Sequence, residues 1–276
     1  MQRIDAHVHF WDYDPVRNSW ITDEMAVLKK DFLPADIQPL LEENSMDGCV
    51  LVQVNQSETE NDFFLKLASE NPFIKAIVGW VDLSAANISE RLSSYKDSYR
   101  ISGFRHILQD EKDRAFMLRP DFERGIRALA EFDFTYDLLI YPDQLPYAAS
   151  LIKSFPQQPF IIDHLAKPAI RDMEMAFWKE QLYNISRMDN VYCKLSGMVT
   201  EARWNNWIKE DFRPYLDVVV ESFGIDRIVF GSDWPVCLAA ASYEEVVGIM
   251  EDYFSSFSIL EQEKIFGSNA MTFYGL

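Results

Sequence analysis

Cysteine is scarce in this chain, and its placement excludes two classes of protein. The three cysteines, Cys49, Cys193 and Cys237, lie far apart and are odd in number. The chain has no CxxC pair and no cysteine–histidine spacing of the kind that forms a zinc knuckle. We therefore expect no disulfide framework, thiols that stay reduced, and a cytoplasmic location.

Positive charge and long hydrophobic runs are also lacking. Lys and Arg number 26 against 44 Asp and Glu, which gives a formal net charge of −18, and no basic run offsets it. Such a chain repels nucleic acid and anionic membranes, so we expect neither as a partner. The chain has no apolar run of about 20 residues that could cross a bilayer. Met1 leads directly into the first expected strand, and we expect no signal peptide there.

What the sequence does contain is a regular alternation of short apolar strands and amphipathic helices. The 276 residues are 48% apolar, which is enough for a large core. The expected strands cover residues 4–10, 49–54, 73–83, 101–107, 134–141, 159–164, 191–197 and 227–233. The expected helices cover residues 35–46, 58–71, 88–95, 120–132, 143–155, 171–188, 211–223, 243–254 and 259–266.

This alternation predicts an α/β protein with parallel strands, either in an open doubly wound sheet or in a closed barrel. The eight strands and the chain length favour a (β/α)8 TIM barrel. No glycine-rich turn of the GxGxxG or GxxxxGK type follows any expected strand, so a nucleotide-binding fold has little support. No linker, low-complexity tract or repeat marks a boundary, and we expect one domain over residues 1–276.

The first expected strand carries two of the four histidines of the chain. In Ile4-Asp5-Ala6-His7-Val8-His9-Phe10, apolar residues alternate with polar ones. Side chains two residues apart on a strand point to the same face, so His7 and His9 should present adjacent imidazoles. Two neutral imidazoles in this arrangement can bind one divalent metal ion or polarise a water molecule. The alternative is that the two histidines have only a structural role at the edge of the core.

Polar side chains gather at the carboxyl ends of the expected strands, where eight-stranded barrels carry their active sites. All four histidines, His7, His9, His106 and His164, lie at such ends. The other polar or aromatic residues there are Gln53, Trp80, Asp82, Arg105, Asp163, Lys167, Lys194, Ser196, Asp233 and Trp234. Of the neighbours Asp163 and His164 only one can face the interior, and we expect it to be His164.

Several of these residues also have a purely structural interpretation. His106 and Arg105 could form a hydrogen-bonded pair at the surface, and Asp233 could do no more than shape a turn. Lys167 and Lys194 could be lysines that bury the apolar part of the side chain and keep the ammonium group in solvent. A carboxylate at the mouth of the eighth strand is better explained as a general base or metal ligand. Tryptophans near these ends suit sugars, whose C–H faces stack on aromatic rings.

Five segments together resemble the amidohydrolase superfamily, and most of all its sugar-lactonase branch. They are His7-Val8-His9, Gly103-Phe104-Arg105-His106, Asp163-His164-Leu165-Ala166-Lys167-Pro168, Lys194-Leu195-Ser196-Gly197 and Gly231-Ser232-Asp233-Trp234-Pro235. The branch includes fuconolactonases, rhamnonolactonases and pyrone-dicarboxylate lactonases. The resemblance implies a barrel of the metal-dependent-hydrolase type. It also implies hydrolysis of a sugar-acid lactone, such as fucono- or rhamnonolactone, in carbohydrate catabolism.

The resemblance also implies roles for individual residues. Asp233 would activate water as the general base, and His164 would be a further catalytic residue. From its place at a strand end, we expect His106 to be catalytic as well. One divalent ion, which we expect to be zinc, would be held by His7, His9 and Asp233. The alternative is a metal-independent mechanism in which His164, His106 or Arg105 donates hydrogen bonds to the oxyanion. The expected substrate-binding residues are Gln53, Trp80, Arg105, Lys167, Lys194 and Trp234. Loops over residues 11–34 and 204–207 would shape the pocket.

Two departures from the family pattern stand out. Ala166 occupies a position where the branch often has Gly, which adds only a methyl group. Residues 134–141 contain no lysine that could bridge two metal ions, so we expect no two-metal centre. A decarboxylase or amide hydrolase on the same barrel, or a non-catalytic sugar-acid binding protein, is the alternative function. The sequence leaves open which lactone is cleaved and whether the chain forms a homo-oligomer.

Overall fold

The structure is a computed structural model that describes residues 2–98 and 100–276, so Met1 and Tyr99 lie outside the described part. Its strands are β1 (Ile4–Val8), β2 (Gly48–Val52), β3 (Ile74–Gly79), β4 (Ile101–His106), β5 (Thr135–Leu138), β6 (Phe160–Ile162), β7 (Val191–Leu195) and β8 (Ile228–Phe230). Its α-helices are α1 (Pro34–Glu43), α2 (Glu58–Glu70), α3 (Ile88–Tyr95), α4 (Pro120–Glu131), α5 (Leu145–Ser154), α6 (Ala176–Ser186), α7 (Met198–Glu201), α8 (Lys209–Phe223), α9 (Tyr243–Phe254), α10 (Ile259–Glu263) and α11 (Asn269–Tyr274).

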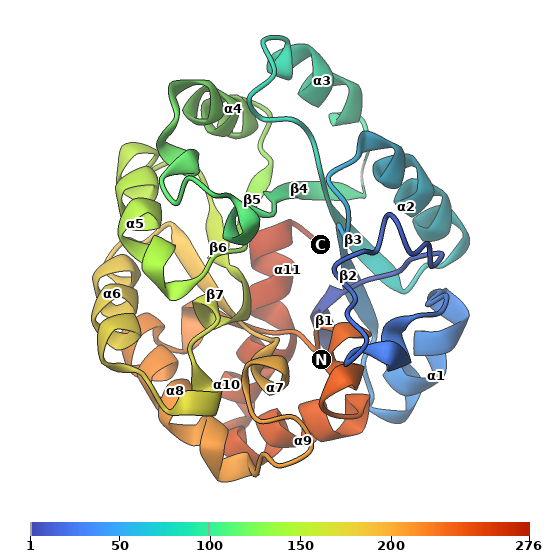
Figure 1. The fold of residues 1–276 in the computed structure, drawn as a ribbon, viewed down its shortest axis with the longest axis vertical. Coiled ribbons are helices and arrows are strands. Elements are labelled where there is room, and N and C mark those ends of the chain that lie inside the picture. Colours follow the sequence, from blue (N-terminus) through green and yellow to red (C-terminus); the bar gives the residue numbers. More distant parts are fainter. Residues whose placement is uncertain (1, 99) are drawn as a thin grey trace.

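The strands form one eight-stranded sheet in which each strand pairs with the next one along the chain (Figure 1). The sheet closes where β1 meets the segment that follows β8. Val8 and Trp234 form a parallel bridge there, and the His9 N–H donates to the Trp234 carbonyl at 2.7 Å. Helices surround this ring on the outside (Figure 1). The predicted (β/α)8 barrel is confirmed, and the open sheet is excluded.

The last helix closes the end of the barrel opposite the site. In Figure 1, α11 lies in the centre of the ring of strands. An inner apolar cluster joins α11 to the strands; its buried members are Ile4, Ala6, Val50, Val52, Ala76, Val78, Ile161, Val229, Ala270, Phe273 and Tyr274. The sequence did not predict this helix, because six residues are too few to show a clear period.

An irregularity in β1 turns its histidines toward the site. Ile4 and Ala6 belong to the inner apolar cluster, so strict alternation would point His7 away from the barrel interior. The pairing of β1 with β2 shifts register between Asp5 and Val8. Such a bulge re-aims the side chains around it. The rings of His7 and His9 lie together, with centroids 4.9 Å apart, as the spacing predicts.

The other departures from the expected elements lie at strand and helix ends. Residues 163 and 164 were expected to extend the sixth strand, but β6 ends at Ile162 and the chain turns. The helix expected over 171–188 starts only at Ala176. Within the described residues, no helix has both the length and the hydrophobicity needed to span a bilayer.

Candidate active site

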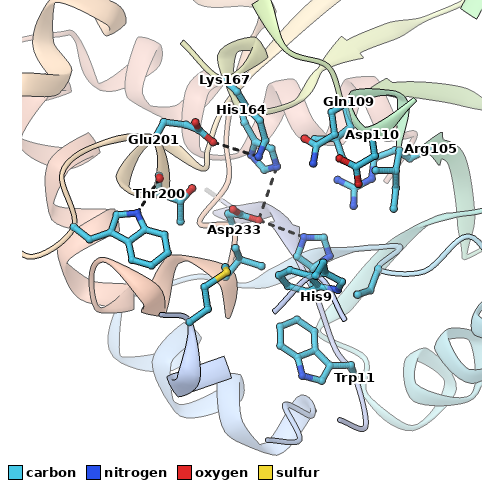
Figure 2. A pocket seen from close by; sticks show the side chains of 17 residues that line it. His9, Trp11, Arg105, Gln109, Asp110, His164, Lys167, Thr200, Glu201 and Asp233 are labelled. Carbon is cyan, nitrogen blue, oxygen red and sulfur yellow. Dashed lines mark hydrogen bonds and ion pairs between the residues drawn. The ribbon is translucent and has the colours of Figure 1, made fainter. Parts of the chain in front are cut away.

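A cavity of about 290 Å³ opens at the carboxyl ends of the strands (Figure 2). Its lining residues are His9, Trp11, Trp20, Met25, Val54, Arg105, Ile107, Gln109, Asp110, Leu139, His164, Lys167, Thr200, Glu201, Trp204, Asp233 and Val236. They come from the segments that follow most of the strands, because parallel strands bring all their carboxyl ends to one rim. The volume is at the lower end of the range for ligand pockets, roughly 300–1,000 Å³, and suits one small ring.

The Asp233 carboxylate lies among three imidazoles. Its Oδ1 is 3.3 Å from His9 Nε2, 3.9 Å from His7 Nε2 and 3.9 Å from His164 Nε2. Asp233 has a φ of +61°, a left-handed conformation that Asp adopts more readily than most residues. Its N–H donates to the His7 carbonyl at 2.9 Å, which ties the end of β8 to β1. The first and last strands of the barrel therefore meet at this carboxylate.

A second partner orients each imidazole beside Asp233. His9 Nδ1 lies 2.8 Å from the Val52 carbonyl, which can only accept, so Nδ1 carries the proton. When the His9 ring is neutral, its Nε2 therefore presents a lone pair to the cavity. His164 Nδ1 lies 2.9 Å from Ser196 Oγ, a hydroxyl that can either donate or accept.

Burial and neighbouring rings set the charge of this group. Burial lowers the pKa of His164 to about 4, so its ring is neutral at neutral pH. Burial would raise the pKa of Asp233, but the nearby His164 and His9 outweigh it and the pKa falls below its ordinary value. Asp233 is therefore ionised at neutral pH and can accept a proton from water.

A buried cluster of charges supports His7 from beneath the cavity. Lys194 Nζ lies 2.5 Å from Asp137 Oδ2, 3.0 Å from Asp163 Oδ1 and 3.2 Å from His7 Nδ1. Arg105 Nη1 donates to Asp163 Oδ2 at 2.9 Å and lies 3.2 Å from His7 Nε2. Burial and the Lys194 ammonium lower the pKa of His7 well below its usual value. His7 is thus a neutral ring between two cations.

The structure brings several of the predicted site residues to the cavity. His9, Arg105, His164, Lys167 and Asp233 all line it. His7 is fully buried beneath it, within 3.9 Å of the Asp233 carboxylate.

His106 is placed differently from its prediction. Its Nε2 lies 2.8 Å from Glu111 Oε1, and its ring stacks on Phe116 with centroids 5.3 Å apart. It is not among the residues that line the cavity. One nitrogen and one ring face of His106 are therefore occupied away from Asp233, and its catalytic role stays a prediction.

The predicted substrate contacts Gln53, Trp80, Lys194 and Trp234 also lie outside the cavity lining. Gln53 Oε1 accepts from Arg105 Nη2 at 3.1 Å, and Trp80 Nε1 lies 3.5 Å from His106 Nδ1. Trp234 is almost fully buried. Position at a strand end does not tell which way a side chain points, and these residues support the lining instead of forming it.

Four polar lining residues escaped the sequence analysis. Gln109 and Asp110 lie in a turn shortly after β4, and Thr200 and Glu201 lie in α7, shortly after β7. They lie a few residues beyond the ends of these strands, and this position was the only indication that the sequence could have given. The two loops both line the cavity, as the sequence predicts. The loop over 11–34 contributes Trp11, Trp20 and Met25, and the loop over 204–207 contributes Trp204.

The donor set suits one divalent ion. Among the described residues, His7, His164 and Asp233 form a group whose ligand atoms all lie within 4.8 Å of one another. This group has His164 where the sequence predicted His9, although His9 Nε2 faces the same carboxylate oxygen. Two imidazole nitrogens and a carboxylate oxygen are ligands that zinc prefers. Arg105 Nη1 lies 3.2 Å from His7 Nε2, so it would compete with an ion for this nitrogen.

Comparison with known proteins matches residues 4–276 to the amidohydrolase family. The chain is 38% identical to an L-fucono-1,5-lactonase of Burkholderia multivorans, over 99% of this chain and 96% of that protein. It is 26% identical to an L-rhamnono-gamma-lactonase of Scheffersomyces stipitis, over 74% of this chain and 69% of that protein. A crystal structure of an amidohydrolase from Burkholderia multivorans with bound zinc matches with a TM-score of 0.96 at 37% identity, covering 100% of both chains.

Proposed function

The chain belongs to the amidohydrolase family, and on this premise we propose that it is a hydrolase that opens a sugar-acid lactone by attack of water. The observation that carries the proposal is the ionised Asp233 at the cavity, with His9 and His164 against its Oδ1. Relatives named for fuconolactone and rhamnonolactone point to the same class of substrate.

Asp233 acts as the general base. A water molecule in the cavity loses a proton to the carboxylate while its oxygen attacks the lactone carbonyl carbon. A positioned base of this kind contributes roughly 100- to 10,000-fold in rate. His9 Nε2 lies 3.3 Å from the carboxylate, and the hydrogen bond from its Nδ1–H to the Val52 carbonyl fixes the ring in this position.

Negative charge then develops on the carbonyl oxygen, and the cavity offers donors for it. Arg105 acts through its permanent positive charge, since both of its terminal nitrogens already donate within the protein. When no ion is bound at its Nε2, His164 supplies an N–H there if Ser196 donates to its Nδ1. Removing one donor to an oxyanion typically costs roughly 100- to 1,000-fold in rate.

A divalent ion, which we propose to be zinc, would be held by His7, His164 and Asp233. When bound, such an ion lowers the pKa of water and polarises a carbonyl. The zinc-bound relative and the donor set support this assignment.

The cavity walls fit a single hydroxylated ring. Indole rings of Trp11, Trp20 and Trp204 offer faces on which the C–H side of a sugar stacks. Gln109 and Asp110 supply hydrogen-bonding groups for hydroxyls. The small volume favours one ring over a longer saccharide.

The test is a panel of aldonolactones incubated with the purified protein and a pH-indicating dye. We expect acid release with at least one of the lactones. Release of carbon dioxide from an aromatic acid would indicate a decarboxylase instead. Stabilisation against heating by a lactone, without acid release, would indicate a binding protein.

A further inference from the structure

The cavity holds two side chains with a permanent or strong positive charge, Arg105 and Lys167. Arg105 is committed to the protein: Nη1 donates to Asp163 Oδ2 at 2.9 Å, and Nη2 donates to the Gln53 carbonyl at 2.5 Å. A guanidinium also does not release its proton in proteins. Lys167 is therefore the cation of the cavity lining that can give up a proton.

An unusual backbone brings Lys167 to the cavity. His164, Leu165, Ala166 and Lys167 have φ values of +54°, +55°, +58° and +49°. None of them is glycine, and a left-handed residue of this kind costs roughly 1–2 kcal/mol. The Lys167 N–H donates to the His164 carbonyl at 2.7 Å, so the four residues form one tight turn.

The turn aligns two side chains that the site uses. In a turn of three residues per repeat, the first and fourth side chains lie on the same side. His164 and Lys167 are the first and fourth residues of this turn, and both line the cavity. Trp178 Nε1 donates to the Leu165 carbonyl at 2.6 Å, which helps to hold the strained backbone. Strain that the surroundings maintain in this way is typical of functional sites.

Glu201 holds the ammonium group of Lys167. Its Oε1 lies 3.2 Å from Lys167 Nζ, and the two side chains are only 22% and 18% exposed. Figure 2 shows Glu201 on α7 reaching toward Lys167 across the cavity from His9. Lys167 forms no ion pair with Asp233, whereas His9 and His164 both face that carboxylate. Burial lowers the pKa of Lys167, but Glu201, Tyr141 and Asp233 together raise it by more, so the pKa lies above its ordinary value and the group is protonated.

We propose that Lys167 is the catalytic acid that protonates the ring oxygen of the lactone as the ring opens, and that Glu201 is its positioning residue. The inference rests on the proposed lactone hydrolysis. Water gives one proton to Asp233 and its oxygen bonds to the carbonyl carbon. The bond from that carbon to the ring oxygen then breaks, and its electron pair stays on the oxygen, which takes a proton from Lys167 Nζ. The new carboxylic acid ionises, Asp233 gives up the proton it took from water, and Lys167 regains one proton, so one proton is released overall.

The reason for an acid is the poor leaving group. An alkoxide is about as basic as hydroxide, since the pKa of water is about 15.7. A thiolate leaves unaided, since the pKa of a thiol is about 8.5. The same sugar lactone with sulfur in place of the ring oxygen therefore needs no acid but keeps every hydroxyl.

The experiment measures kcat and KM for an aldonolactone and its thiolactone with the wild-type protein, Lys167→Met, Lys167→Arg and Glu201→Gln. We expect Lys167→Met to lower kcat on the lactone by roughly 100- to 10,000-fold and on the thiolactone by less than about tenfold. Lys167→Arg keeps the positive charge, but a guanidinium does not give up a proton. This variant should therefore lose as much kcat on the lactone as Lys167→Met does. Glu201→Gln should lower kcat on the lactone more than on the thiolactone. The exposed Lys179→Met is the matched control and should leave both rates unchanged.

The outcomes separate the two proposals. Equal losses on both substrates, or rescue of the lactone rate by Lys167→Arg, would overturn the acid role and leave Lys167 as a binding residue or Asp233 as the proton donor. Retained thiolactone turnover shows at once that the variant is folded. Failure of the wild-type protein to open any lactone would instead overturn the proposed function.

Discussion

Replacing Lys194 by Met should destabilise the fold, because this residue compensates buried charge beneath the site. Its side chain is fully buried, and its Nζ lies 2.5 Å from Asp137 Oδ2 and 3.0 Å from Asp163 Oδ1. Methionine has a similar length but no charge, so the two carboxylates lose their shared cation. Breaking a buried pair by removing one partner costs roughly 3–5 kcal/mol. That is a large part of a total stability of about 5–15 kcal/mol.

Urea unfolding followed by circular dichroism measures this loss. A second substitution tests its cause: Asp137→Asn in the Lys194→Met background removes one uncompensated charge. We expect the double variant to recover roughly 1–3 kcal/mol relative to Lys194→Met. In conditions where the variants are folded, KM should stay near the wild-type value, because Lys194 does not line the cavity. A loss below about 1 kcal/mol, typical of an exposed pair, together with a raised KM would refute this reasoning and restore the substrate-binding role.

The remaining predictions concern a pH dependence, a glycine and the metal group. Burial raises the pKa of Asp5 from 3.8 to about 6, so the folded state binds this proton more tightly than the unfolded state. The contribution of Asp5 to stability should therefore be fully present below about pH 4 and be lost, by about 3 kcal/mol in all, as the pH rises through 6. Asp5→Asn should remove this slope in urea titrations. Gly197 has a φ of +62°, and an added Cβ would lie 2.5 Å from His164 Nδ1. Gly197→Ala should therefore lower stability by about 1–3 kcal/mol and reduce turnover. A thermal midpoint equal to that of the wild-type protein would contradict this. Elemental analysis should find one zinc ion per wild-type chain and none in His164→Asn; equal zinc in both would exclude His164 as a ligand.

The architecture could be predicted because its signals are local and repeated. Eight apolar segments alternate with amphipathic helices, and the number of strands and the chain length favoured the closed barrel over the open sheet. The meeting of His7, His9, His164 and Asp233 followed from that topology, since every strand end lies on one rim. The bulge in β1 could not be predicted, because it depends on the pairing of Asp5 to Val8 with β2.

Two predicted site residues have partners that the sequence did not indicate, and the physical reason is the same for both. His106 and Lys194 occupy strand ends as expected, but Glu111 draws His106 away from the cavity and Asp137 draws Lys194 beneath it. These partners come from a loop and from a distant strand, and sequence pattern does not reveal such pairs. Glu201 was missed for a different reason. It reaches the cavity from α7, a helix too short to predict from the sequence.

The most direct measurement of the central claim is the turnover of an aldonolactone by Asp233→Asn beside the wild-type protein. Asn also tolerates the φ of +61°, and its amide can donate to His9 Nε2, so the variant should fold with a nearly unchanged thermal midpoint. We expect kcat/KM to fall by roughly 100- to 10,000-fold. Turnover by Asp233→Asn within a few-fold of the wild-type rate would contradict the role of this carboxylate as the base.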